Sequence, residues 1–192
     1  MTPPTYLVID LEATCSDDGS VPRTEMEIIE IGAVLVTDGD FRRVDEFQTL
    51  VRPVRHPSLT AFCTELTSIT QADIATAPTF ADAIAAFKGW LYRDARETQD
   101  MLFCSWGDYD RRQLQQDCDF HRLPFPIGAR HVNVKEQMRR SQTLSKRPGL
   151  GQAIALAGLE FAGTPHRALP DARNIARLLP YIFGADRLPS GG

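Results

Sequence analysis

The stretch TYLVIDLEATC, from Thr5 to Cys15, brings two carboxylates to the end of an apolar run. LVID at 7–10 predicts a buried strand that leads into Asp10, and Glu12 follows two positions later. Side chains at i and i+2 of a strand lie on one face, and ligand sites of open α/β sheets lie at strand ends. A divalent cation with oxygen ligands would relieve the repulsion within such a pair. The alternative is that Asp10 caps a turn and Glu12 is solvated.

Further apolar segments extend this strand into a sheet. EIIEIGAVLVTDGD at 27–40 predicts a longer strand ending in a turn, and FRRVDEFQTLVRP at 41–53 alternates sufficiently to be its hairpin partner. MLFCSW at 101–106 predicts a second short buried strand. RHVNVKEQM at 130–138 predicts a short strand that leads into a helix.

Helical patterns occupy much of the remaining chain. Short helical turns are expected at 58–80, and Thr79 or a neighbour is expected to cap the helix that begins at Phe80. Helices are also predicted at 108–121, 150–159 and 169–184. The last of these has apolar residues at i, i+3, i+4 and i+7, which form a predicted core face: Ala172, Ile175, Ala176 and Leu179. A hairpin followed by alternating strands and helices predicts a mixed α/β sheet that is covered on its faces.

The composition is that of an ordinary globular protein. Of the 192 residues, 43% are apolar and 24% are charged, which suits a single domain over 1–192 with a core at about 5–184 and a flexible tail at 185–192. Because neither a signal peptide nor an apolar run of membrane length is found, a soluble cytoplasmic protein without a membrane partner is expected. The four cysteines form no close pair in the sequence, which argues against a zinc site or a disulfide framework.

Two more loci carry carboxylates. Asp108 and Asp110 lie just past the apolar strand of 101–106, and Asp171 lies in the first turn of the last helix, shortly after His166. Each has an ordinary explanation, because an anion is favoured at a helix N-terminus and a loop histidine is usually a hydrogen-bonded residue. Together with the first motif they supply a carboxylate cluster and a proton acceptor, the set that phosphodiester hydrolysis with two metal ions needs.

In these three motifs, VIDLEATC, SWGDYD and HRALPDARN, the chain resembles DEDDh-type 3′→5′ exonucleases of the RNase H-like superfamily. The spacing of four residues between His166 and Asp171 marks the h subclass, and the wider likeness over residues 5 to 184 is to the ERI-1/3′hExo/KapD-like branch. The resemblance implies a mixed five-stranded sheet with helices on both faces. It also implies release of nucleoside 5′-monophosphates from the 3′ end of single-stranded nucleic acid, with RNA favoured over DNA.

The resemblance assigns roles to individual residues. Asp10, Glu12 and Asp171 would be ligands of two divalent cations, Mg²⁺ or Mn²⁺, and His166 would be the general base. Asp110 is preferred over Asp108 as the fourth carboxylate, because the family places an aromatic residue directly before the ligand. The backbone of two residues and the side chains of four others would contact the terminal nucleotides: Ala13 and Thr14, then Phe62, Leu66, Trp106 and Tyr109. Core packing is the alternative role for the last four.

The charge pattern leaves one feature open. The net charge of −4 disfavours a protein that only coats nucleic acid, although a carboxylate site with metal ions does not require a basic chain. The segment 130–147 carries six basic residues against Glu136, as either a solvated helix face or a patch that faces phosphates.

Two other functions compete. A haloacid dehalogenase-like phosphatase would use Asp10 as its nucleophile, but a suitable lysine and acidic pair are not evident, and His166 and Asp171 stay unexplained. A non-catalytic nucleic-acid-binding relative would not need the full set of ligands and base. Because only residues 1–5 precede the first strand, a stand-alone nuclease domain is expected, with a single-stranded 3′ end as its partner and no stable protein partner predictable.

Overall fold

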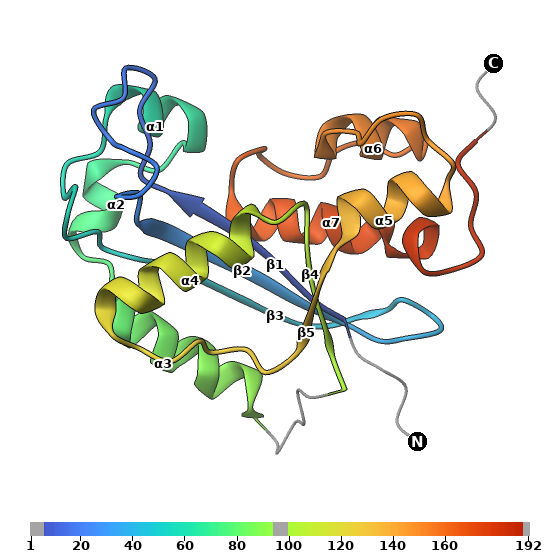
Figure 1. The fold of residues 1–192 in the computed structure, drawn as a ribbon, viewed down its shortest axis with the longest axis horizontal. Coiled ribbons are helices and arrows are strands. Elements are labelled where there is room, and N and C mark those ends of the chain that lie inside the picture. Colours follow the sequence, from blue (N-terminus) through green and yellow to red (C-terminus); the bar gives the residue numbers. More distant parts are fainter. Residues whose placement is uncertain (1–5, 94–99, 190–192) are drawn as a thin grey trace.

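In the computed structural model, which describes residues 6–93 and 100–189, one twisted sheet runs through the middle of the molecule (Figure 1). Five strands form the sheet: β1 (Tyr6–Ala13), β2 (Ile28–Val36), β3 (Arg43–Leu50), β4 (Leu102–Ser105) and β5 (Arg130–Asn133). Their order is β3-β2-β1-β4-β5. β1, β2 and β3 form an antiparallel meander, and β4 and β5 are parallel to β1. β1 therefore lies at the centre.

Seven helices are described: α1 (Ala61–Thr67), α2 (Gln71–Ala75), α3 (Phe80–Leu91), α4 (Tyr109–His121), α5 (Val134–Ser141), α6 (Leu150–Leu156) and α7 (Ala168–Ile182). α3 and α4 pack on one face of the sheet, and α5, α6 and α7 pack on the other (Figure 1). α1 and α2 gather beyond the end of β1, where they enclose a smaller apolar cluster with β2. The mixed five-stranded sheet with helices on both faces is thus present as expected.

Alternation along β1 decides where the acidic residues point. Its odd-numbered apolar residues, Leu7 to Leu11, belong to the core on the α3 and α4 face. Tyr6 and Val8 belong to the core under α7. Asp10 and Glu12 continue this second row, so that β1 is apolar along most of its length and acidic only at its end.

The β1 and β2 pairing fixes two contacts that matter for the site. Asp10 is opposite Gly32, and Glu12 is opposite Glu30. The register shifts between Glu12 and Ala13, where a β-bulge ends the regular ladder. Bulges re-aim side chains at the ends of strands, and this one separates Glu12 from the loop that follows.

Several local predictions are confirmed. Thr79 is the N-cap of α3, where its hydroxyl accepts from the backbone N–H of Asp82. The predicted core face of α7 is buried. In the segment 185–189, whose flexibility stays a prediction, Gln142 donates to the backbone oxygen of Asp186 at 3.0 Å and accepts from the N–H of Leu188 at 3.1 Å. The rest of that predicted tail, 190–192, lies outside the described residues, as does Thr5 at the start of the predicted core. Among the helices described, none has both the length and the apolar character needed to cross a membrane.

Candidate active site

The end of β1 presents the first two acidic residues of the site. Asp10 and Glu12 lie on the same face of the strand, and both side chains are only partly exposed. The neighbouring loop is tied down on the far side of the bulge, because the N–H of Thr14 donates to the Glu27 oxygen at 2.8 Å. The paired carboxylates predicted from the sequence are therefore side by side.

α4 supplies the third carboxylate. Asp110 lies in the first turn of α4, is buried, and accepts from the backbone N–H of Leu11 at 3.0 Å. This bond crosses from α4 to the residue between Asp10 and Glu12. Asp108 is exposed, makes no capping hydrogen bond, and accepts from the Asn133 amide at 3.1 Å. The structure thus brings Asp110, and not Asp108, to the end of β1.

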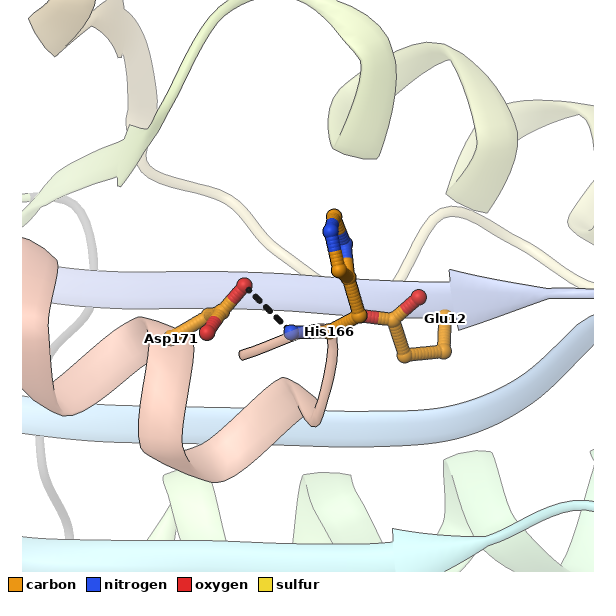
Figure 2. A group of neighbouring side chains, drawn as sticks. All are labelled: Glu12, His166 and Asp171. Carbon is orange, nitrogen blue, oxygen red and sulfur yellow. Dashed lines mark hydrogen bonds between the residues drawn. The ribbon is translucent and has the colours of Figure 1, made fainter. Parts of the chain in front are cut away.

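α7 and the loop before it supply the remaining two residues. Asp171 lies in the first turn of α7, and one of its carboxylate oxygens accepts from the His166 N–H at 3.3 Å (Figure 2). One ligand atom from each of Glu12, His166 and Asp171 lies within 4.8 Å of the others. The His166 side chain is exposed, and its backbone has a φ of 58°, a left-handed conformation that costs a residue with a side chain roughly 1–3 kcal/mol. Surrounding contacts must therefore hold this loop.

Glu30 provides those contacts, and sequence reasoning missed it. This carboxylate is fully buried on β2 and accepts from Arg167 at 2.8 and 3.0 Å and from the N–H of Ala168 at 2.9 Å. The Gln48 amide of β3 donates to it as well, at 2.6 Å. Arg167 and Ala168 directly follow His166, so Glu30 fixes the end of the loop and the start of α7. The only sequence signal was an acidic residue within an otherwise apolar strand.

The four carboxylates called here the carboxylate cluster all have raised pKa values: Asp10, Glu12, Asp110 and Asp171. Burial is the main cause in each case, and the neighbouring negative charges add to it. The pKa of Asp10 is well above its ordinary range, because of burial first and of Asp110 next. The pKa rises to about 8 for Glu12, to about 7 for Asp110 and to about 6 for Asp171. A bound cation would favour the charged forms of these groups, whereas in its absence they take up protons more readily than ordinary carboxyls.

Asp171 also carries an oxygen without a partner. Its Oδ1 is buried and, among the residues that the structure describes, accepts no hydrogen bond. Such an atom is costly unless a ligand satisfies it. Hard divalent cations such as Mg²⁺ and Mn²⁺ prefer carboxylate oxygens, so the donor set fits the cofactor that the sequence predicted.

The residues predicted to contact nucleotides fall into two groups. Phe62 and Leu66 lie one turn apart on α1 with about a third of their surface exposed, and Tyr109 is 45% exposed. α1 adjoins the site, because the Thr60 hydroxyl donates to the Cys15 oxygen at 2.6 Å. These three side chains are free to meet a ligand.

The other three predicted contacts are already engaged or enclosed. Trp106 packs against the core under α7 and donates its ring N–H to the Pro148 oxygen at 3.3 Å. Ala13 and Thr14 are buried, and the backbone N–H and hydroxyl of Thr14 are both bonded to Glu27. The Thr14 N–H is therefore not available to a nucleotide, which would have to contact other atoms of this segment.

Two cysteines that are far apart in the sequence meet beside Glu12. Cys15 and Cys63 are both free thiols, and a hydrogen bond between them raises the pKa of Cys15 and lowers that of Cys63 to about 7. The sequence alone did not reveal that Cys15 and Cys63 are neighbours, because they are far apart along the chain.

The sequence is similar to those of known exonucleases. Residues 7–179 match the family model described as Exonuclease, RNase_T. The chain belongs to the RNase_T exonuclease family. Human ERI1 exoribonuclease 2 is 32% identical to this RNase_T chain over 192 aligned positions, which cover 90% of the chain and 27% of that protein. Human 3′-5′ exoribonuclease 1 is 31% identical, over 89% of the chain and 50% of that protein. The RNase_T chain thus spans between about a quarter and a half of these curated relatives.

Solved structures of other proteins share the fold. The nuclease domain of 3′hExo, a DEDDh family member bound to rAMP, has a TM-score of 0.81 to this RNase_T chain and 30% identity, covering 92% of this chain and 90% of that one. A structure of 3′-end specific recognition of histone mRNA stem-loop by 3′-exonuclease has a TM-score of 0.81 and 29% identity, over 93% of this chain and 81% of that one. The RNase H-like fold and the DEDDh-type resemblance are confirmed.

Proposed function

We propose that this RNase_T chain is a metal-dependent 3′→5′ exonuclease that acts on single-stranded nucleic acid, RNA in preference to DNA, and releases nucleoside 5′-monophosphates. The observation that carries the proposal is the grouping of Glu12, His166 and Asp171 within 4.8 Å of one another. Asp10 and Asp110 adjoin this group, because the pKa of Asp10 is raised, after burial, by the charges of Asp110, Glu12 and Asp171, and Asp110 accepts from the Leu11 N–H. The family and the exoribonuclease names of its relatives support the same reaction. The chain is proposed to act as one exonuclease domain over 1–192.

Each side chain of the site has a task in this reaction. The carboxylate cluster would hold two divalent cations, Mg²⁺ or Mn²⁺. When bound, these cations would supply the positive charge that polarises a phosphodiester and lowers the pKa of water. His166 would take the proton of the water whose oxygen attacks the terminal phosphorus. The bond from phosphorus to the 3′-oxygen then breaks, and that oxygen takes up a proton from solvent. An imidazole suits this task because it exchanges protons near neutral pH.

The contacts with substrate would divide between bases and backbone. Phe62 and Leu66 present exposed apolar surface on α1, which can stack on a base of any identity. Tyr109 is the third candidate for stacking, because it is exposed and lies directly before Asp110. The partly buried position and the hydrogen bond of Trp106 favour a structural role for it.

The cytoplasmic location stays a prediction from the sequence.

The phosphatase alternative is not favoured. A haloacid dehalogenase-like site would use Asp10 as a nucleophile and would leave His166 and Asp171 without a task. The family model and the relatives agree with the nuclease. A non-catalytic relative is disfavoured because the carboxylate cluster and His166 are all present.

One gel tests the proposal. Single-stranded RNA and DNA of equal sequence, labelled at the 5′ end, are incubated with the protein in Mg²⁺, Mn²⁺ or EDTA. We expect a ladder that shortens from the 3′ end with either metal and is abolished by EDTA and by Asp10→Asn. His166→Ala is expected to slow cleavage with less effect on binding, whereas equal rates for His166→Ala and the parent would contradict the assignment of the base. Free phosphate with intact strands would indicate the phosphatase instead.

A further inference from the structure

A cleft lies at the N-terminus of α4, where Asp108 and Arg112 line it. This cleft has a volume of about 730 Å³, and its walls come from the loop before β2, from the start of α4, from the start of α5 and from the loop after α5. Each of these four segments contributes one basic side chain: Arg23, Arg112, Lys135 and Arg147. We call this feature the cationic cleft. Asp108 is the one acidic residue among those that line it.

A single carboxylate, Glu136, serves several of the six basic residues in the run at 130–147. Glu136 binds Arg139 at 2.8 Å and Arg140 at 2.8 Å, and Arg147 reaches the same carboxylate only at 4.0 Å. Glu136 therefore offsets only one of the six positive charges in this run. Lys135, in the first turn of α5, lines the cleft.

Three of the cleft cations have no such partner. Within residues 6–93 and 100–189, no ion pair joins Arg23, Arg112 or Lys135 to a carboxylate. Arg23 and Arg112 are exposed, and Lys135 is half-buried. A protein with a net charge of −4 thus gathers unpaired cations from three separate segments into one concave place. Like charges repel, so this arrangement is suited to a polyanion that binds across the segments.

The cationic cleft is continuous with the site. A smaller hollow of about 350 Å³ shares Arg23, Asp108 and Arg112 with it and extends to Tyr109. Tyr109 directly precedes Asp110 in the first turn of α4. The hollow therefore leads from the cleft to the edge of the carboxylate cluster. A chain of phosphates could follow this path without crossing the apolar surface of α1.

We propose that the cationic cleft binds the backbone phosphates of a single strand on the 5′ side of the nucleotides held at the carboxylate cluster. This inference rests on the proposed exonuclease function and adds a place for the part of the substrate that is not being cut. The two flanks of the site then differ in chemistry, because α1 offers apolar side chains to bases and the cleft offers cations to phosphates. Phosphate contacts position a strand without reading its sequence, as a processing enzyme requires.

The test compares two double variants that remove the same charge. Arg112→Gln with Lys135→Gln removes one cation from each of two of the four walls of the cleft, whereas Lys88→Gln with Arg187→Gln removes two exposed cations that do not line it. Binding of a fluorescent single strand of about 20 nucleotides, as RNA and as DNA, is measured over a salt series in EDTA, because each phosphate contact contributes about 0.7 to the salt slope of single strands. Thermal melting checks that each variant is folded.

We expect the cleft variant to bind on the order of tenfold more weakly than the parent, with a salt slope lower by about 1.4, while the control variant behaves like the parent. The rise in KM for cleavage in Mg²⁺ should be larger for the long strand than for a trinucleotide. Equal losses in the two double variants, or an unchanged slope in the cleft variant, would overturn the proposal.

The binding result stays separate from the reaction. If the parent fails to cleave either strand but the slope falls as expected, the cleft stands and the exonuclease proposal fails. If the parent cleaves and the slope does not fall, the exonuclease stands and the cleft does not. Binding of RNA and DNA with the same slope supports readout of the shared phosphodiester, whereas a loss that is independent of salt would exclude phosphate contacts.

Discussion

Gly32 of β2 lies directly beneath Ala168, the first residue of α7. A Cβ atom built on Gly32 would lie 2.2 Å from the Ala168 carbonyl carbon, which is closer than any side chain tolerates. α7 can therefore rest on the sheet only because position 32 has no side chain. Gly32 is also opposite Asp10 in the β1 and β2 ladder. This one contact sets the distance between the end of β1 and the helix that carries Asp171.

Gly32→Ala is accordingly expected to lower both stability and activity. The added methyl group meets main-chain atoms, which cannot move aside as a side chain would, and the cost should be roughly 1–3 kcal/mol or more. The start of α7 would shift away from β1, and Asp171 and His166 with it, so kcat should fall. Gly89→Ala is the control, because a Cβ there meets nothing within 4 Å and alanine in a helix should add about 0.5–1 kcal/mol. Urea melts and turnover of both variants decide the matter, and a fully active Gly32→Ala would contradict this account.

Arg167→Ala should loosen the loop that carries His166, because Arg167 ties the end of this loop to Glu30. The substitution leaves the buried Glu30 carboxylate without the two hydrogen bonds from the guanidinium. Breaking a buried ion pair in this way lowers the free energy of unfolding by at least about 3 kcal/mol. Because His166 precedes Arg167, we expect kcat to fall more than KM rises. Arg173→Ala breaks a more exposed pair with Glu46 and should cost no more than about 1 kcal/mol. Similar effects of the two variants on kcat would mean that Glu30 and Arg167 do not position the loop.

The sequence predicted local features well and long-range contacts poorly. The i and i+2 spacing of Asp10 and Glu12 and the first-turn position of Asp171 follow from the geometry of one strand and one helix, so both could be read without coordinates. Glu30 and Gly32 act through α7, more than 130 residues away, and no local pattern reveals such a partner. For Trp106, stacking on a base and packing in the core produce the same aromatic residue in the sequence. Only the tertiary contacts of its ring distinguish them.

Divalent cations should stabilise the folded chain, and Asp10→Asn should remove that effect. A ligand that binds only the folded state adds about 2.7 kcal/mol at a concentration one hundredfold above its Kd. In EDTA the same variant is expected to melt at a higher temperature than the parent, because the neutral amide relieves burial and repulsion of charge at Asp10. Asp119→Asn, on the exposed side of α4, should melt like the parent in both buffers. A parent whose melting temperature is unaffected by Mg²⁺ and Mn²⁺ would contradict the metal assignment.

The metal-free protein should lose stability as pH rises from about 5 to about 8.5. In the unfolded chain the pKa of a carboxyl is about 4, whereas folding raises the pKa of Asp171 to about 6, of Asp110 to about 7 and of Glu12 to about 8. The folded state therefore binds more protons than the unfolded state over this range, and the free energy of unfolding falls as pH rises through it. Glu12→Gln should flatten the upper part of the profile, and saturating Mg²⁺ should flatten it in the parent. Urea melts in EDTA measure this, and a parent that gains stability relative to Glu12→Gln over the range would refute it.

Asp110→Asn and Asp108→Asn provide the sharpest comparison within the site, because two nearly adjacent aspartates are expected to respond in opposite ways. Asp110 is buried against the backbone of β1, so its amide variant can keep the hydrogen bond from Leu11 while it loses the charge that a cation requires. We expect its turnover to fall by a factor on the order of a thousand, as for a lost metal ligand, with little change in melting temperature.

Asp108 is exposed and lines the cationic cleft, so Asp108→Asn removes an anion from the proposed path of the strand. That variant should bind long strands somewhat more tightly and continue to cleave them. Single-turnover rates with Mg²⁺ and strand binding in EDTA test both expectations, and a larger loss of rate in Asp108→Asn than in Asp110→Asn would reassign the fourth carboxylate.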